Sequence, residues 1–269
     1  MINKSIDIWK GIDKFADKEY RPILDTYILK GERKRPTVLV CPGGGYEFTS
    51  PREAEPVALQ FNEAGYNAFV LYYSVAPEKH PQPLLDVSRS MCIIRNNSEK
   101  WNIKKDKIAV CGFSAGGHLA ASLGVHWEKS YLDIKGIEIG SNKPNFLILG
   151  YPVITAGEFS HQGSIKNLVG KDPELREEMS LEKQVNQETP PTFIWHTCAD
   201  KAVPVKNSLL FVESLRKNEI PFEFHIFPEG PHGLSLATAE TDDGEMGAYP
   251  HVARWIKLCK EWLEINFNK

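Results

Sequence analysis

The chain alternates short apolar runs with longer amphipathic stretches. The apolar runs are rich in β-branched and aromatic residues and show no polar face, so each predicts a strand that is buried on both sides. They cover residues 37–41, 68–73, 107–111, 146–149 and 192–195. The stretches of helical length cover residues 52–63, 84–99, 115–125, 205–218 and 247–266. This alternation predicts a mainly parallel central sheet with helices on both faces.

One further run has a different pattern. Phe222–Phe227 reads FEFHIF and alternates apolar with polar residues. Such alternation is typical of a strand with one exposed face, so we expect it near an edge of the sheet. The following residues, 228–231, read Pro-Glu-Gly-Pro and predict a loop.

A long segment between the fourth and fifth buried strands predicts an insertion. Residues 156–189 exceed an ordinary connection of about 4 to 6 residues, which indicates a small cap or lid. Asp172 followed by Pro173 predicts a helix start, with an N-cap acceptor and a proline in the first turn. Two pairs at a spacing of four predict an inward face for that helix: Leu175 with Met179, and Leu181 with Val185. A packing insertion is an equal alternative to a functional lid.

Composition narrows the class of protein. The chain has 269 residues, 32 Lys plus Arg and 35 Asp plus Glu, which gives a net charge of −3. This size fits one α/β domain over residues 1–269, and the absence of a basic excess argues against nucleic acid as a partner. The five cysteines form neither a CxxC pair nor a zinc-type spacing, so no metal site is predicted.

The pattern of apolar residues also argues against a membrane partner. No apolar run approaches the roughly 20 residues that a membrane-spanning helix needs. Residues 1–14 carry charges throughout and lack the apolar core of a secretory signal, so we expect a cytoplasmic protein.

A candidate nucleophile follows the third buried strand. Gly112, Ser114 and Gly116 form a G-x-S-x-G pattern between the strand-like residues 107–111 and a helix of small residues. A serine exposed on a tight strand-to-helix turn needs glycines beside it, because a Cβ there would collide with neighbouring backbone. We therefore predict that Ser114 is the nucleophile of a hydrolase.

A serine hydroxyl needs a base and an acid that orients the base. His232, in the loop after the last strand, is the best candidate base, and Asp200, just after the fifth buried strand, is the best candidate acid. Rivals for the acid are Asp172 and Glu229. The remaining histidines are interpreted as structural or surface residues, with His118 in a supporting role beside the nucleophile: His80, His118, His126, His161, His196, His225 and His251.

The segment C-P-G-G-G-Y at 41–46 predicts a loop whose backbone N–H groups stabilise an oxyanion, with the Ala115 N–H as a further donor. Tyr46 and Leu234 lie beside these motifs and are candidate pocket walls. The acids Glu53 and Glu55 are interpreted as solvated residues of a first helical turn.

Together these motifs resemble a known family. C-P-G-G-G-Y, R-E-A-E-P-V-A, G-F-S-A-G-G-H-L-A-A, P-P-T-F-I-W-H-T with Asp200, and P-E-G-P-H-G-L are similar to those of the acetyl-xylan-esterase-like and feruloyl-esterase-like α/β-hydrolases, over residues 35–267. The resemblance implies the α/β-hydrolase fold and a triad of Ser114, Asp200 and His232. It also implies oxyanion donors at Gly44, Gly45 and Ala115, with Pro42 where related lipases have a histidine.

The resemblance further implies a serine esterase without metal or organic cofactor. Its substrate would be a short-chain, most often acetyl, ester of a carbohydrate such as a xylo-oligosaccharide. A serine peptidase of prolyl-oligopeptidase type and a non-catalytic hydrolase-fold receptor for a small molecule are the alternatives. The sequence leaves homo-oligomerisation open.

Overall fold

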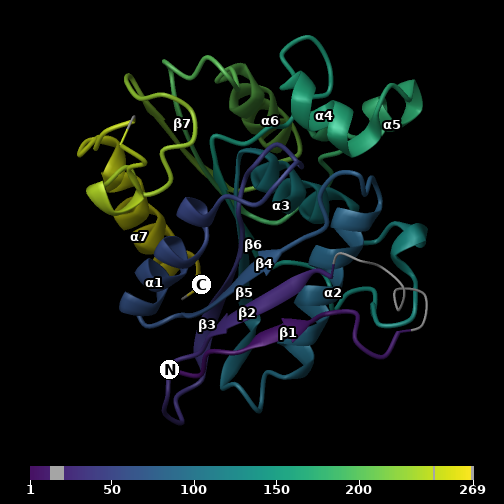
Figure 1. Cartoon of the computed structure of the whole chain (residues 1–269), viewed down its shortest axis with the longest axis vertical. Coiled ribbons are helices and arrows are strands. Elements are labelled where there is room, and N and C mark those ends of the chain that lie inside the picture. The colour runs from purple at the N-terminus through teal and green to yellow at the C-terminus, as the bar shows by residue number, and fades with distance from the viewer. Residues whose placement is uncertain (13–20, 245, 268–269) are drawn as a thin grey trace.

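The computed structural model describes residues 1–12, 21–244 and 246–267. In this part of the chain one eight-stranded sheet forms the centre of the molecule, with strand order β1-β2-β4-β3-β5-β6-β7-β8 (Figure 1). The strands are β1 (Ser5–Asp7), β2 (Ile23–Tyr27), β3 (Arg35–Cys41), β4 (Asn67–Tyr72), β5 (Ile103–Phe113), β6 (Phe146–Gly150), β7 (Thr192–Thr197) and β8 (Phe222–Phe227).

Strands β3 to β8 run parallel, and β1 and β2 join the sheet antiparallel. The prediction of a mainly parallel sheet of the α/β-hydrolase type is confirmed. Within the described ranges β8 pairs only with β7, so it lies at an edge of the sheet, as its alternating pattern predicts. Most of its residues are partly exposed.

Helices cover both faces of the sheet. α1 (Glu55–Glu63) and α7 (Trp255–Phe267) pack on one face, and Figure 1 shows them together at the left. α2 (Gln82–Asn96), α3 (Ser114–His126) and α6 (Lys206–Lys217) pack on the other. Strand β5 contributes to both apolar layers, because Ala109 and Cys111 face α1 and α7 while Ile108 and Val110 face α2 and α3.

The C-terminal helix is shorter than its amphipathic pattern predicts. The expected helix of residues 247–266 begins only at Trp255, after a 3₁₀ turn over Val252–Arg254. Pro250 explains part of this difference, because its ring disfavours the helical conformation for Tyr249 before it. Further 3₁₀ turns cover Pro51–Glu53, Ser130–Leu132, Leu181–Lys183 and Ala239–Thr241.

The insertion between β6 and β7 forms two short helices instead of one longer helix. α4 (Gln162–Val169) precedes α5 (Pro173–Glu178), and both lie at the upper right of Figure 1. Asp172 caps α5, since its carboxylate accepts hydrogen bonds from the N–H groups of Glu174 and Leu175 at 3.0 and 3.1 Å. α5 ends before Leu181, so the inward face predicted through residue 185 does not belong to one helix.

None of the helices in the described ranges is long and apolar enough to cross a lipid bilayer.

Candidate active site

Ser114 lies at the junction of β5 and α3, where β5 ends at Phe113 and the helix begins at once. Its backbone has φ 53°, a left-handed conformation that is rare for a residue with a side chain. A Cβ on Gly116 would overlap the carbonyl oxygens of Cys41 and Pro42, so only glycine lets α3 start this close to β3. These contacts hold the Ser114 hydroxyl at the carboxyl end of the sheet.

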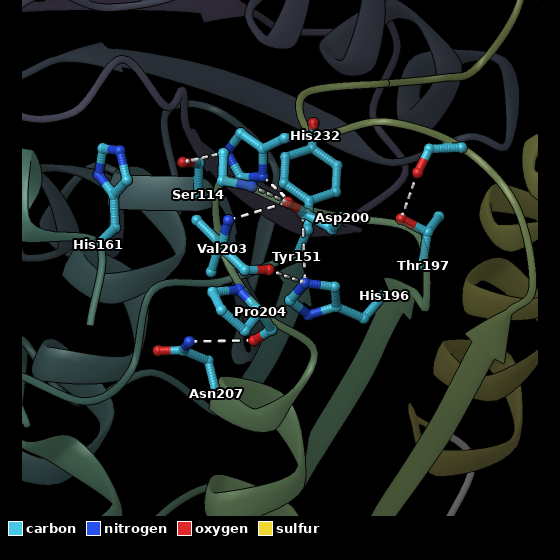
Figure 2. A network of polar contacts seen from close by, with 12 residues as sticks. Ser114, Tyr151, His161, His196, Thr197, Asp200, Val203, Pro204, Asn207 and His232 are labelled. Atoms are coloured by element: carbon cyan, nitrogen blue, oxygen red, sulfur yellow. Dashed lines mark hydrogen bonds and ion pairs between the residues drawn. The ribbon is translucent and has the colours of Figure 1, made fainter. Parts of the chain in front are cut away.

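The structure brings the three predicted triad residues together. His232 Nε2 lies 2.8 Å from Ser114 Oγ, and His232 Nδ1 lies 2.6 Å from Asp200 Oδ2 (Figure 2). Because a carboxylate only accepts, Nδ1–H donates to Asp200 and Nε2 is free to accept the serine proton. The three residues follow β5, β7 and β8, and β6 lies between β5 and β7 in the sheet.

Asp200 receives hydrogen bonds from several other groups. The N–H groups of Ala202 and Val203 donate to Oδ1 at 3.0 and 2.8 Å, and His196 Nε2 lies 3.3 Å from Oδ2. Burial by itself would raise the pKa of Asp200, but the hydrogen bonds from His196, His232 and Val203 outweigh it and hold this pKa well below its ordinary value. Asp200 is therefore an ionised, immobile acceptor for the imidazole.

His196 was interpreted from the sequence as a core or surface residue, and the structure gives it a more specific position. It is fully buried, its Nδ1 lies 2.8 Å from Ser208 Oγ, and its Nε2 lies 2.9 Å from the carbonyl of Val203. Since Val203 O can only accept, Nε2 carries the proton and also faces Asp200. The signal available in the sequence was its spacing of four residues from Asp200.

The loop that carries His232 is fixed to the sheet. Thr197 Oγ1 donates to the carbonyl of Gly230 at 2.8 Å, as Figure 2 shows. On its other side the imidazole of His232 meets the ring of Tyr151 edge to face, with centroids 5.1 Å apart. Both contacts restrict the imidazole to the position in which it reaches Ser114.

The glycine loop after β3 faces the same site. Its carbonyl groups accept hydrogen bonds from partners outside the site: Pro42 O from Tyr73, Gly43 O from Ser50, Gly44 O from Glu47 and Phe48, Gly45 O from Asn167, and Tyr46 O from Ala76. The N–H of Gly43 donates to Glu53 Oε2 at 2.6 Å. Within the described residues no acceptor is found for the N–H groups of Gly44 and Gly45, which leaves both free for an oxyanion.

Ala115 occupies the first turn of α3, where backbone N–H groups have no partner within the helix. Its N–H is therefore a further free donor beside Ser114. The three donors that the family resemblance implies are thus compatible with the hydrogen bonding of the loop and helix.

Ser114 and His232 open on a cavity of about 280 Å³. Its other walls are Gly44, Gly45, Glu47, Phe48, Ser50, Arg52, Glu53, His161, Gly233 and Met246. Tyr46 and Leu234, expected as pocket walls, are not among these residues. Both are almost fully buried, and the Tyr46 hydroxyl lies 2.9 Å from His118 Nδ1 in the core.

His118 has the supporting role that its place in α3 indicates. It is fully buried between the Tyr46 hydroxyl and the carbonyl of Met179, which lies 3.0 Å from its Nε2. Burial lowers the pKa of His118 to about 4, so the ring is neutral near pH 7. It connects the glycine loop to the cap insertion and does not reach Ser114.

His161 was interpreted as a surface or core residue, but it lies on the cap side of the cavity (Figure 2). It precedes α4, and its Nδ1 accepts a hydrogen bond from the Ser164 N–H. The proton of the neutral ring is consequently on Nε2. Burial, with the nearby His232, lowers the pKa of His161 and favours this neutral form.

The environment of Glu53 differs from the one that the sequence predicts. It was interpreted as a solvated helix-start residue, yet only 3% of its surface is exposed. Its neighbour Arg52 donates to the carbonyls of Gly233 and Thr241 at 3.1 and 3.0 Å. Arg52 therefore contacts the loop that carries His232, and Glu53 contacts the glycine loop. Nothing in the local sequence pattern distinguishes these two residues from exposed charges.

Within the described ranges, no cluster of three or more His, Cys, Asp or Glu side chains has the geometry to hold a metal ion.

Comparison with known proteins identifies the relatives of this chain. The BD-FAE family matches residues 24–215. The chain is 43% identical over 255 residues to endo-1,4-beta-xylanase B of Butyrivibrio fibrisolvens and 32% identical over 209 residues to an acetylxylan esterase of Xylanibacter ruminicola. These matches cover 90% and 75% of this chain but only 39% and 41% of the relatives, so the chain spans less than half the length of either.

A solved structure matches almost end to end. The crystal structure of an acetyl ester-xyloside bifunctional hydrolase from Caldicellulosiruptor lactoaceticus is 43% identical and superposes with a TM-score of 0.87. The match covers 97% of this chain and 95% of that one.

Proposed function

This chain belongs to the BD-FAE family and has the α/β-hydrolase fold, and from that premise we propose that it is a serine esterase acting on short-chain acyl esters of carbohydrates. The observation that carries the proposal is the hydrogen-bonded line from Ser114 through His232 to Asp200 at the wall of a cavity. Esterases among the related proteins support the same reaction class.

Acylation begins with the attack of Ser114 Oγ on the ester carbonyl carbon, while His232 Nε2 takes the hydroxyl proton. Asp200 stabilises the imidazolium that forms. The carbonyl oxygen becomes negative and accepts hydrogen bonds from the N–H groups of Gly44, Gly45 and Ala115. When the tetrahedral intermediate collapses, the C–O bond to the alcohol breaks and His232 returns its proton to the departing oxygen.

Deacylation repeats these steps with water as the nucleophile. His232 takes a proton from the water, the hydroxide adds to the acyl carbon, and the bond to Ser114 Oγ breaks as His232 protonates that oxygen. The products are one alcohol and one carboxylic acid, and the enzyme returns to its starting state.

The substrate class is inferred from the cavity and the relatives together. A volume of about 280 Å³ bounded by Phe48 and Met246 accommodates a short acyl group more readily than a long chain. Polar walls such as Glu47 and His161 offer partners for hydroxyl groups. Since two relatives are named for acetyl esters of xylan or xyloside, we infer an acetylated xylo-oligosaccharide as the substrate.

The proposal is tested by the hydrolysis of p-nitrophenyl acetate, butyrate and octanoate by the wild type and by Ser114→Ala. We expect kcat/KM to fall with acyl length and activity to be lost in the variant. Release of acetate from acetylated xylo-oligosaccharides is the second measurement. Hydrolysis of peptide substrates in place of esters would favour the peptidase alternative, and an absence of all hydrolysis would favour the receptor.

A further inference from the structure

A buried carboxylate joins the two halves of the site. Glu53 Oε2 accepts a hydrogen bond from the Gly43 N–H at 2.6 Å, and Glu53 Oε1 lies 2.5 Å from the Tyr151 hydroxyl. Glu53 follows β3 in the 3₁₀ turn Pro51–Glu53, whereas Tyr151 comes directly after β6. One side chain thus connects the glycine loop to the aromatic ring that packs on His232.

The direction of each hydrogen bond is fixed by its partners. The Ser235 N–H donates to the Tyr151 oxygen at 2.8 Å, so the phenolic proton is directed to Glu53 Oε1. Both oxygens of Glu53 therefore accept, which is the pattern of an ionised carboxylate. Burial raises the pKa of Glu53 above its ordinary value, and the hydrogen bonds from Tyr151 and Gly43, together with the interaction with His232, offset only part of that rise.

The glycine loop depends on this carboxylate for one peptide group. Gly43 is the residue before Gly44 and Gly45, and Glu53 is the partner of its N–H. Without that acceptor the Pro42–Gly43 peptide keeps only the bond from Tyr73 to its carbonyl, so the loop is less constrained and the N–H groups of Gly44 and Gly45 shift away from the oxyanion. The carboxylate also lies close against Gly43, where an added Cβ would come within 2.7 Å of Oε2.

The base depends on the same group through Tyr151. The Tyr151 backbone has φ 34°, and its ring meets His232 edge to face. Its hydroxyl is held between Glu53 and the Ser235 N–H, while Ser235 Oγ donates to the carbonyl of Arg52 at 2.6 Å. These hydrogen bonds link the 3₁₀ turn that carries Glu53 to the loop that carries His232.

We propose that Glu53 is a positioning residue that, through Gly43 and Tyr151, aligns the oxyanion donors and the imidazole of His232 at the same time. This proposal rests on the proposed esterase function and names a fourth polar residue on which that site depends. We expect Glu53 to stabilise the transition state and not the bound ester, because the groups that it aligns act on the tetrahedral intermediate.

The test compares Glu53→Gln and Tyr151→Phe with the wild type on p-nitrophenyl acetate, with rates expressed per active site titrated by a fluorophosphonate. An amide at position 53 presents only one acceptor, so either Gly43 or Tyr151 loses its partner. Because a whole oxyanion donor is worth about 10²–10³ in kcat, we expect misalignment to lower kcat by about 10- to 100-fold with little change in KM. The inhibition constant of a trifluoromethyl ketone, which forms a tetrahedral adduct, should rise by a similar factor.

Matched controls separate this role from a loss of folding. Glu55→Gln removes an exposed carboxylate two residues away, and Tyr131→Phe removes a hydroxyl that donates to Glu178 at 3.1 Å far from Ser114. Both controls should keep wild-type values. A merely structural Glu53 would lower the titrated fraction but leave kcat per site and ketone binding unchanged, and that result overturns the proposal.

The outcomes also separate this inference from the proposed function. A wild type without Ser114-dependent hydrolysis overturns both. An active wild type with unaltered Glu53→Gln kinetics overturns the positioning role alone. If Glu53→Gln does not fold, Tyr151→Phe decides the question by the same two readouts.

Discussion

At the scale of single residues, the site is a set of side chains whose partners determine their protonation. Asp200 accepts from two backbone N–H groups and from His232, with His196 also within reach of its Oδ2. The Ser164 N–H sets the tautomer of His161 in the same way. In each case a fixed donor or acceptor, and not the residue type alone, decides what the side chain can do.

The first prediction concerns the orienting acid. Asp200→Asn should lower kcat by roughly 10³- to 10⁴-fold, because an amide cannot hold the His232 tautomer that accepts the serine proton. Asp172→Asn, which preserves an N-cap acceptor in the exposed cap helix, serves as the matched control and should keep wild-type kcat. Steady-state kinetics with p-nitrophenyl acetate measure both variants. Similar rates for Asp200→Asn and the wild type would remove Asp200 from the mechanism.

Sequence patterns identified some of these residues and missed others for a physical reason. Ser114, Asp200 and His232 each follow a strand that the sequence predicts. Because these strands are parallel, their carboxyl ends lie at the same end of the sheet and place the three residues there. Glu53, His161 and His196 acquire their environments from tertiary packing. A charged residue at the start of a helix is usually solvated, and only the fold shows that Glu53 is enclosed.

At the scale of elements, the approach of α3 to β3 determines where Ser114 lies. Gly116→Ala should abolish activity and lower the melting temperature by more than about 5 °C, because the new methyl group would overlap the backbone of residues 41 and 42. Gly157→Ala is the control, since its Cβ would come no closer than 3.3 Å to Thr155 Oγ1. Thermal melts and ester hydrolysis are the measurements. Wild-type stability of Gly116→Ala would contradict the close contact.

The cap insertion contributes His161 to the cavity, which gives a prediction about the alcohol part of the substrate. The Nε2–H donor of His161 should pair with a sugar oxygen, so His161→Phe should lower kcat/KM for acetylated xylobiose about 5-fold more than for 1-naphthyl acetate. That factor corresponds to one hydrogen bond of about 1 kcal/mol. His251→Phe, at an exposed position, is the control. Equal losses on the two substrates would show that His161 does not contact the sugar.

The order of elements could largely be predicted from the sequence, but the two antiparallel strands β1 and β2 could not. The five doubly buried strands have continuous apolar runs that no loop would carry. β1 has only three residues, and β2 reads ILDTY with two polar residues among its five. β1 pairs with β2, and β2 pairs with β4, through contacts distant in sequence, so a local pattern gives little signal.

At the scale of the whole molecule, buried titratable groups determine how stability depends on pH. Burial lowers the pKa of His118 and of His126 to about 4, whereas burial raises the pKa of Asp86 to about 6. Between pH 6.5 and 4 the unfolded chain binds more protons at each histidine than the folded one, so stability falls as the pH falls. Asp86 acts in the opposite direction below pH 6, because its folded form binds the extra proton.

Burial also lowers the pKa of His80 and His161 and raises the pKa of Glu53 and Glu182. Four histidines thus act against three carboxyl groups, and the free energy of unfolding should decrease from pH 7 to pH 4.5. His126→Gln keeps a donor for the Glu178 carbonyl but removes one titrating group. It should lose less stability on acidification, by about 1 kcal/mol per pH unit for the single proton removed. Urea unfolding at pH 7, 5.5 and 4.5 measures this, with exposed His251→Gln as control. A slope identical to that of the wild type would contradict the linkage.

The proposed esterase requires that Ser114 be an activated nucleophile with His232 aligned as its base. The most direct test is peptide mapping by mass spectrometry after reaction with a fluorophosphonate. We expect a single adduct on Ser114, formed rapidly in the wild type and at least about 100-fold more slowly in His232→Gln, because the serine then lacks its base. An adduct on another residue, or an unchanged rate in His232→Gln, would contradict it.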